Sequence, residues 1–485
     1  MLDDALIHLR YAENLWLTGM FSYDANTPTY GTSSPFFVIL LAVFTLVGAG
    51  VAMPKAISTF LMLVLLALAT WKVVTTRAAT WLVLLIVLVS PMGFRWLADG
   101  METSAAALLA VLIAAQGFWN PGKARSALLV GAVCFSAGLV AVTTRIELGL
   151  GIGALGLVSF VLGDWRQARR SWLPLALGGA AGYALLGATF GHIVPDTAIA
   201  KAFGPMSLGE AVLVALFSSA TAFSFGIGLM LLWCASFVAL LRTASVRWRV
   251  ATLIVNSVLP VLVLFVAVRG QAVQGVRHLL WAYAFAITWN MLALERRRGA
   301  ERGEFAPPWG RAWRGILAGL AIGVVVMWTV EVPLTLRILA ARRGVLQGMR
   351  EARLERLAGM TGAAYDVGYI GYFSKAQMLD LSGLVNGREV ASMSSKARLE
   401  RAALRRPQFL FLTSEQVERV GAALDVTQYV VVRSFRSRRV SSDERYALAV
   451  LRPLAPAIGS DCAEEQPTLA EFASAGGAIP CLGHH

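Results

Sequence analysis

Charged residues are scarce in this sequence. Only 15% of its 485 residues are Asp, Glu, Lys or Arg, whereas 57% are hydrophobic, and the mean hydropathy is +0.64. An ordinary soluble domain is about a quarter charged and about half apolar. Apolar runs of roughly 17–25 residues, the length needed to span a bilayer, recur along most of the chain. The composition therefore excludes an ordinary soluble protein and predicts a polytopic α-helical membrane protein.

Acidic residues are outnumbered by basic ones, 29 against 43, which gives a formal net charge of +14. This excess does not indicate nucleic-acid binding, because arginines gather in short loops between apolar runs, as the positive-inside rule requires. We therefore expect the lipid bilayer, and no nucleic acid, as a partner. We also expect no cleavable signal peptide, since the chain starts with acidic residues rather than a basic segment followed by an apolar one.

The apolar runs predict ten or eleven helices. Basic clusters precede alternate crossings, and placing them in the cytoplasm puts segments 95–101, 144–147, 191–210 and 269–277 outside. With residues 1–33 also outside, the runs between 36 and 97 give one crossing too many, and 36–52 is the candidate for a partial crossing. The expected spans are 36–52, 56–75, 79–97, 101–118, 127–143, 147–162, 172–190, 211–241, 250–268, 277–294 and 315–332.

The composition changes near residue 334, where charged residues become frequent. Short alternating runs at 408–413, 429–435 and 446–453 predict strands, and 337–359 predicts an amphipathic leading helix. We therefore expect two domains: a transmembrane domain over 1–333, with residues 1–35 as an external loop, and a soluble α/β domain over 334–485. The topology places this second domain outside the cytoplasm.

Cysteine is rare, with four in the chain. Cys134 and Cys234 lie in apolar runs and are expected to pack there. Cys462 and Cys481 lie in the external tail, where disulfides persist, and we predict that they pair; two free thiols are the alternative. Such a bond would contribute about 3 kcal/mol by closing a loop.

The first 18 residues combine charge with a helical pattern. The sequence predicts a helix over 4–18 headed by Asp3 and Asp4, which could act simply as N-terminal caps. Asp3, Arg10 and Asn14 share one face of that helix. An acid, a base and an amide at a membrane edge suit the binding of a polar substrate, so both interpretations stay open.

Eight stretches carry a resemblance to a known family. Residues 3–24 (DDALIHLRYAENLWLTGMFSYD) and 28–42 (PTYGTSSPFFVILLA) resemble the first external loop of GT-C membrane glycosyltransferases, and in particular the bacterial branch that includes terminal arabinofuranosyltransferases. Further matches follow in order: DGMETSAAALL at 99–109, TRIELGLG at 144–151, HIVPDTAIAKA at 192–202, VRHLLWAYAFA at 276–286, and two tail segments expected to be strands, DVGYIGYF at 366–373 and LDLSGLVN at 379–386.

The resemblance has departures. Ile199, Asp196 and Ile146 stand where the family usually has an aromatic residue, Asn and Pro. Family members also have a transmembrane helix before the paired aspartates, and none precedes them here, so we expect a truncated or mis-started chain.

The resemblance implies the GT-C fold and an inverting transfer of a sugar from a polyprenyl phosphate to a hydroxyl of a glycan, lipid or protein outside a bacterial plasma membrane. It makes Asp3 the general base and Asp4 its helper or a group that orients the acceptor. The implied donor-phosphate ligands are Lys201, Arg145, Arg277 and Arg10, and the implied substrate ligands are Tyr30, Glu102 and His278. No cofactor is implied. A divalent ion on Asp3, Asp4 and Glu102 is conceivable, but no spacing demands it.

Each of these residues also has an ordinary interpretation. Lys201 could be a lysine that reaches toward the interface, Arg145 could pair with Glu147, and Glu102 could cap a helix. Arg277 and His278 could mark an interfacial helix end, Tyr30 could belong to an aromatic belt, and His8 is expected to be structural.

Two other functions compete with the enzyme. A transporter or flippase would also bury charges, but such proteins tend to show internal repeats, and we find none. A membrane scaffold with an external binding domain is the second alternative. The sugar and the acceptor cannot be read from the sequence, because one fold serves many substrates.

Overall fold

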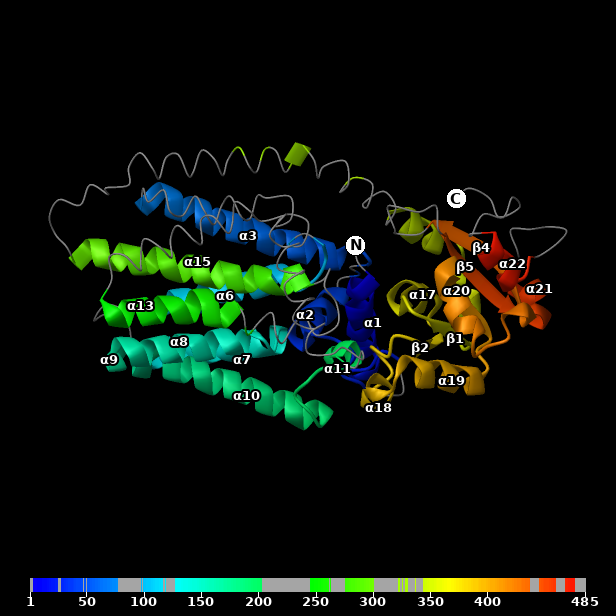
Figure 1. Ribbon diagram of the computed structural model, residues 1–485, viewed down its shortest axis with the longest axis horizontal. Coiled ribbons are helices and arrows are strands. Elements are labelled where there is room, and N and C mark those ends of the chain that lie inside the picture. The colour runs from blue at the N-terminus through cyan, green and yellow to red at the C-terminus, as the bar shows by residue number, and fades with distance from the viewer. Residues whose placement is uncertain are drawn as a thin grey trace.

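The computed structural model describes most of the chain. The described residues are 3–24, 28–46, 48, 50–76, 97, 99–116, 118, 127–202, 245–260, 262, 275–300, 322, 325, 328, 329, 336, 343–436, 445–458 and 467–475. Figure 1 shows long helices side by side in one half, a sheet with short helices in the other half, and α1 standing between them.

The helical half follows the predicted apolar runs closely. Three described helical segments are long and apolar enough to cross a membrane: Met53–Lys72, Ala127–Thr144 and Ala168–Phe190. The helices are α1 (Asp3–Thr18), α2 (Pro35–Thr45), α3 (Met53–Thr76), α6 (Thr103–Gln116), α7 (Ala127–Thr144), α8 (Leu148–Leu162), α9 (Trp165–Gln167), η1 (Ala168–Trp172), α10 (Leu173–Phe190), α11 (Asp196–Ala202), α13 (Val246–Leu253), η2 (Ile254–Val258) and α15 (Gly275–Ala300).

The run at 36–52 does not form a full crossing helix. Its helix, α2, has 11 residues, which extend about 16 Å, well short of the ~30 Å hydrocarbon layer. This length supports the partial crossing expected there. The runs at 211–241 and 315–332, and all but the last residue of 79–97, lie outside the described residues apart from isolated positions.

Glycines bring α7 and α10 into backbone contact. A Cβ at Gly138 would clash with the backbone of Leu175, and one at Gly178 would clash with the backbone of Phe135. Small residues at such positions allow membrane helices to approach closely. Nearby, the Cys134 side chain is fully buried and lies 3.2 Å from the Gln116 side-chain oxygen, so its predicted packing role is confirmed.

The second half is an α/β unit. Its five strands are ordered β2-β1-β3-β5-β4, with β1 parallel to β2 and β3, and β5 antiparallel to β3 and β4. The three predicted strands are confirmed as β3 (Phe409–Thr413), β4 (Tyr429–Arg436) and β5 (Arg445–Leu451), joined by β1 (Thr361–Ala364) and β2 (Gln377–Asp380). The helices are η3 (Leu354–Leu357), α17 (Val367–Ser374), α18 (Arg388–Ser392), α19 (Ser395–Arg405), α20 (Ser414–Gly421), η4 (Val426–Gln428), η5 (Arg452–Leu454), α21 (Ala455–Ile458) and α22 (Leu469–Ser474).

One tail prediction was wrong and a second was right only in part. Residues 367–374 form the helix α17 rather than a strand. They are buried at nearly every position, so they lack the alternation that separates strands from helices. The stretch at 379–386 is a strand only to Asp380, whose carboxylate accepts hydrogen bonds from the amides of Ser382, Leu384 and Val385 and turns the chain. The leading helix is described from residue 343 and is helical to 351.

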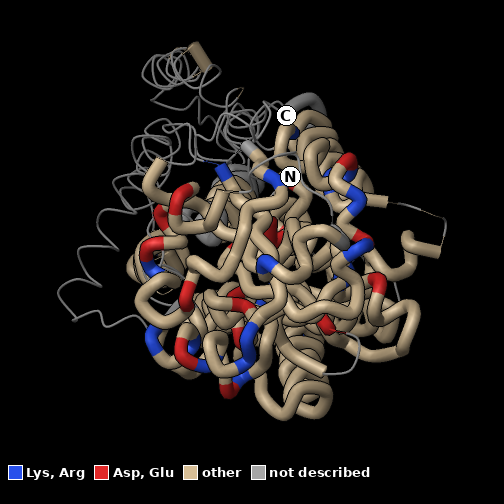
Figure 2. Tube along the Cα trace, turned by 90° about the vertical axis from the view of Figure 1, so that its right-hand side faces the viewer, with Lys and Arg blue, Asp and Glu red and all other residues tan. Residues whose placement is uncertain are grey.

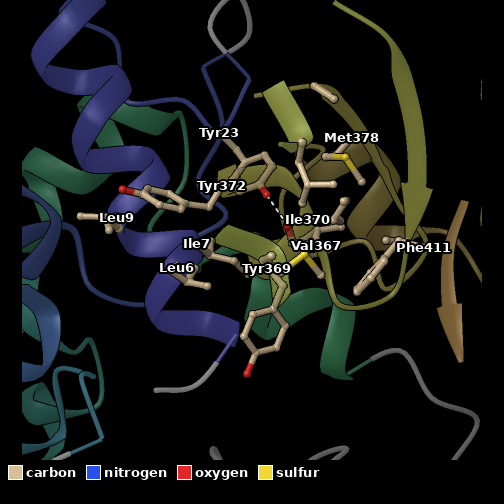
Figure 3. Close-up of a cluster of buried hydrophobic side chains, with 14 of the residues drawn as sticks. Leu6, Ile7, Leu9, Tyr23, Val367, Tyr369, Ile370, Tyr372, Met378 and Phe411 are labelled. Carbon is tan, nitrogen blue, oxygen red and sulfur yellow. Dashed lines mark hydrogen bonds between the residues drawn. The ribbon is translucent and has the colours of Figure 1, made fainter. Parts of the chain in front are cut away.

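A single apolar cluster joins α1 to the α/β half. Leu6, Ile7 and Leu9 of α1 pack with Tyr369 and Ile370 of α17 and with side chains of the sheet, and Figure 3 shows them in one cluster. The helix that carries the paired aspartates is therefore part of the core of the α/β half.

The surface of the α/β half, by contrast, is charged. In the end-on view, Lys and Arg are interspersed with Asp and Glu (Figure 2).

Candidate active site at the second face of α1

The helix α1 turns its two leading aspartates in different directions. Successive residues of an α-helix are about 100° apart, so Asp3 and Asp4 cannot share a face. Asp3, Arg10 and Asn14 lie on one face, which we call the first face. Asp4, His8 and Tyr11 lie on the other, which we call the second face.

The first face is fastened to the α/β half. The Asp3 carboxylate, only 4% exposed, accepts hydrogen bonds from the backbone amides of Gly368 (3.1 Å) and Tyr369 (2.6 Å) at the start of α17. Arg10 Nε and Asn14 Nδ2 both donate to the carbonyl of Tyr23. The face that the sequence predicted for polar substrate thus holds protein backbone instead.

The second face meets a buried ion pair. Arg145 Nε and Nη2 donate to Glu102 Oε1 at 3.0 and 2.6 Å, and Glu102 Oε2 lies 3.8 Å from His8 Nδ1. Glu102 and Arg145 are at most 1% exposed. The Ser33 hydroxyl lies 3.3 Å from Glu102 Oε1, so residues from four parts of the chain converge here.

Further carboxylates surround Arg145. Glu147 lies 3.9 Å from the guanidinium, and half-buried Asp4 interacts with it electrostatically. The pair expected from sequence, Arg145 with Glu147, is thus secondary to the closer pair with Glu102. Asp4, Glu102 and Glu147 form an acidic cluster with Arg145 at its centre, at the helix junctions before α6 and between α7 and α8.

Tyr30 lies beside this cluster and is buried, not part of an exposed aromatic belt. Its ring stacks on Phe190 with centroids 4.2 Å apart, and its backbone exchanges hydrogen bonds with Asp196 at the start of α11. Burial raises the pKa of the Asp196 carboxyl, against the opposing effect of nearby His192. Segments 28–34 and 191–202 are therefore tied together, as expected for loops on the same side.

Buried hydroxyls also gather around the ion pair. Within the described part of the chain, five of them make no hydrogen bond, and each residue is at most 1% exposed: Tyr30, Ser34, Thr103, Ser104 and Thr144. Thr103 and Ser104 are the two residues after Glu102. Thr144 directly precedes Arg145, and Ser34 directly follows Ser33. A buried hydroxyl without a partner costs about 1–3 kcal/mol, so this end of the helices is suited to a ligand with many hydrogen-bonding groups.

Three predicted site residues have side chains outside the described residues. Lys201 belongs to α11, and Arg277 and His278 belong to the first turn of α15, by their backbone alone. Cys462, Cys481 and Cys234 also lie outside. Among the described residues, no group of three or more His, Cys, Asp or Glu is arranged to hold a metal ion.

His8, expected from sequence to be structural, is buried on the second face. It lies at i+4 from Asp4 and so on the same side of α1. Its ring approaches Glu102 and packs edge-on against Phe37. The spacing was visible in the sequence, but Glu102, nearly a hundred residues away, was not identifiable as its neighbour.

Comparison with solved structures identifies the fold. ArnT from Cupriavidus metallidurans matches in its apo state (TM-score 0.56, 14% identity) and bound to undecaprenyl phosphate (TM-score 0.54, 13% identity). Each match covers 93% of this chain and 94% of the other. The chain has the GT-C fold of ArnT. No curated protein sequence matches it significantly.

The ArnT match extends over both halves of the chain. By contrast, the matching family model, described as a domain of unknown function (DUF8728), covers only residues 344–450 in the α/β half. The fold class predicted from sequence is thereby confirmed, and three of the predicted membrane helices are long and apolar enough to cross a membrane. The arabinofuranosyltransferase branch stays a prediction, because the solved neighbours are ArnT.

The stability of this ArnT-like fold should depend on pH through Asp24, which lies near the contact between α1 and the α/β half. Burial raises the pKa of its carboxyl to about 6, although Arg10 and an amide hydrogen bond from Met378 oppose the shift. A raised pKa means that the folded state binds the proton more tightly than the unfolded chain. The free energy of unfolding therefore falls as pH rises from about 4 to about 6, and the loss persists at pH 7.

Asp24→Asn should therefore raise the free energy of unfolding by roughly 1–3 kcal/mol at pH 7.5 and by little at pH 4. Unfolding of the purified protein, followed at both pH values, measures this. Asp425→Asn is the control of opposite sign, because hydrogen bonds from Thr427 and Gln428 lower the pKa of Asp425. Equal stabilisation by Asp24→Asn at both pH values would contradict the account.

Proposed function

We propose that the protein is an inverting glycosyltransferase that moves a sugar from a polyprenyl phosphate to an acceptor hydroxyl. The fold supports this, because a solved neighbour is ArnT bound to undecaprenyl phosphate. The observation that carries the proposal is local: an acidic cluster and five buried hydroxyls without partners in the described structure meet at one end of the membrane helices. A sugar ring, with hydroxyls in every direction, fits that inventory.

Asp4 is the best candidate for the general base. Asp3 is the first choice by resemblance, but both of its carboxylate oxygens accept backbone hydrogen bonds at α17. Asp4 lies on the second face, is half-buried, and interacts electrostatically with Arg145. In the proposed step the acceptor oxygen attacks the anomeric carbon, its proton passes to Asp4, and the bond from that carbon to the phosphate oxygen breaks. The electron pair leaves with the polyprenyl phosphate.

The leaving phosphate needs positive charge close by. Arg145 is enclosed by carboxylates and bonded to Glu102, so we assign it to holding the acidic cluster rather than the phosphate. Arg10 donates to Tyr23 on the first face. Lys201 and Arg277 remain the proposed phosphate ligands, on α11 and on the first turn of α15.

The proposed location is a bacterial plasma membrane, with the acidic cluster and the α/β half on the extracytoplasmic side. The arginine-rich loops support this orientation. The division into a transmembrane domain over 1–333 and an α/β domain over 334–485 also stays a proposal. Because α1 packs into the core of the α/β half, we expect neither part to be stable alone. The acceptor would be an envelope glycan, lipid or protein, and no metal or cofactor is proposed.

A donor panel tests the function. Purified full-length protein is incubated with radiolabelled polyprenyl-phosphate arabinofuranose, mannose or aminoarabinose, and release of label into water or onto an added glycan is measured. Turnover of one donor is expected, with inversion at the anomeric carbon. Saturable donor binding without turnover of any donor would instead support a flippase.

A further inference from the structure

We propose that Asp3 is a positioning residue, which fixes the catalytic Asp4 by binding the N-terminus of α17. The α/β half would then be a structural part of the catalytic end, connected to it through one carboxylate. The inference rests on the proposed function, because it concerns where the general base is held.

The contact between Asp3 and α17 is specific. The first amides of a helix have no partners within the helix, and the helix dipole favours a negative charge there. Asp3 supplies that charge from 365 positions earlier in the chain, with one oxygen for Gly368 and the other for Tyr369. The adjacent Asp366, at the N-cap position, makes no side-chain capping bond. Asp3 therefore takes the place of the local cap.

Gly368 is required for this approach. A Cβ at this position would clash with the backbone oxygen and the carboxyl carbon of Asp3. The backbone of α1 and the start of α17 are thus closer than any other residue type would allow. The contact can be broken from either half of the molecule, by changing Asp3 or by adding a methyl group at Gly368.

A third hydrogen bond holds α17 in the same register. The Tyr23 hydroxyl donates to the carbonyl of Val367 at 2.6 Å, as the dashed line in Figure 3 shows. Tyr23 is itself held by Arg10 and Asn14 through its own carbonyl. The first turn of α17 is therefore bound to α1 both directly and through Tyr23. The ion pair of Glu13 with Lys375 is more exposed and should contribute little.

This attachment bears on catalysis because Asp4 is the next residue. A rotation or shift of the first turn of α1 changes the distance between Asp4 and Arg145 at the centre of the acidic cluster. A misplacement of about 1 Å at a reacting group can cost about 100-fold in rate. Asp3 therefore influences the reaction without contacting the substrate.

The first test measures the attachment without using activity. Hydrogen exchange is followed on the full-length protein for wild type, Asp3→Ala, Asp3→Asn, Gly368→Ala and, as a matched charge-removal control, Glu13→Gln. Asp3→Ala and Gly368→Ala should each speed exchange at least tenfold at the amides of Gly368 and Tyr369 and in the first turn of α1. Asp3→Asn keeps one acceptor oxygen and should show a smaller change, and Glu13→Gln none. Unchanged exchange in both disrupting variants would overturn the proposal.

The second test measures kcat and KM, corrected for folded protein, with whichever donor of the panel wild type uses. Asp3→Ala and Gly368→Ala should each lower kcat roughly 10-fold to 100-fold, with the donor KM within about twofold. The double variant Asp3→Ala with Gly368→Ala should have a kcat no lower than that of the less active single variant, because both changes break the same contact. Asp3→Asn should recover at least part of the rate, whereas a merely structural contact would leave kcat per folded molecule unchanged.

Two results would overturn the positioning role. Gly368→Ala could speed exchange and yet keep full kcat, which would show that the attachment does not position the base. Asp3→Asn could keep slow exchange and yet lose as much activity as Asp4→Asn, which would make Asp3 itself the base. A wild type that transfers no sugar from any donor is a different failure: it rejects the proposed function, and the positioning role with it, while the exchange data still report on the attachment.

Discussion

Asp4→Asn should lower turnover roughly 100-fold to 10,000-fold, the contribution typical of a general base, while donor affinity changes by less than about threefold. The amide keeps the size and hydrogen-bonding capacity of the carboxylate but cannot accept the acceptor's proton. Asp4 lies on the face of α1 that meets Arg145 and Glu102 rather than the one that binds α17, so the fold should survive the change. Initial rates and donor binding on the same preparation measure both quantities.

A nucleophile that needs no deprotonation separates the base from its alternatives. Azide is already anionic, so azide should restore turnover of the donor by Asp4→Asn and give a glycosyl azide of inverted configuration. Glu13→Gln removes the same charge from the same helix, at an ion pair with Lys375, and should keep wild-type rates. If azide fails to restore any turnover while donor binding is intact, Asp4 acts in some way other than accepting the proton.

Much of the fold was predictable because the signals are local. Composition and run length predicted the membrane helices, the polar start of the chain predicted α1, and alternation predicted three strands of the sheet. The failures arose where burial was complete: α17 lies between α1 and the sheet, so its sequence carries no periodicity to distinguish helix from strand. Likewise, only the structure shows that one apolar cluster contains both α1 and the sheet.

The site was predictable as a set of segments but not as a set of contacts. The loops that the arginine pattern placed together do meet, through Tyr30 with Asp196 and Glu102 with Arg145. Adjacent aspartates, however, look equivalent in a sequence, and the division between Asp3 and Asp4 depends on partners, Gly368 and Arg145, that are distant from them and from each other in the sequence. Spacing within one helix shows that two side chains diverge, but it cannot show what each of them meets.

The buried ion pair of Glu102 and Arg145 should be important for the stability of the fold. Glu102→Ala should lower the free energy of unfolding by about 3–5 kcal/mol, because it leaves a guanidinium buried without its closest carboxylate. Arg145 is 1% exposed and directs two donors at a single oxygen of Glu102, so the substitution leaves both donors without that acceptor. Glu102→Gln, which keeps an acceptor oxygen, should cost less. Thermal unfolding of the purified protein measures the order.

A double variant then separates the structural role of the pair from its chemical role. Glu102→Leu with Arg145→Met replaces both charges by apolar side chains of similar size, and such replacements of buried ion pairs are often neutral or stabilising. We expect stability to return to within about 1 kcal/mol of wild type, while turnover stays at least 100-fold lower, because Asp4 loses the guanidinium beside it and charge that stabilises the site electrostatically is removed. A double variant that is both stable and active would reduce the ion pair to a packing element and leave Asp4 to act without it. A double variant as unstable as Glu102→Ala would show that the hydroxyls around the pair depend on its charges to remain buried.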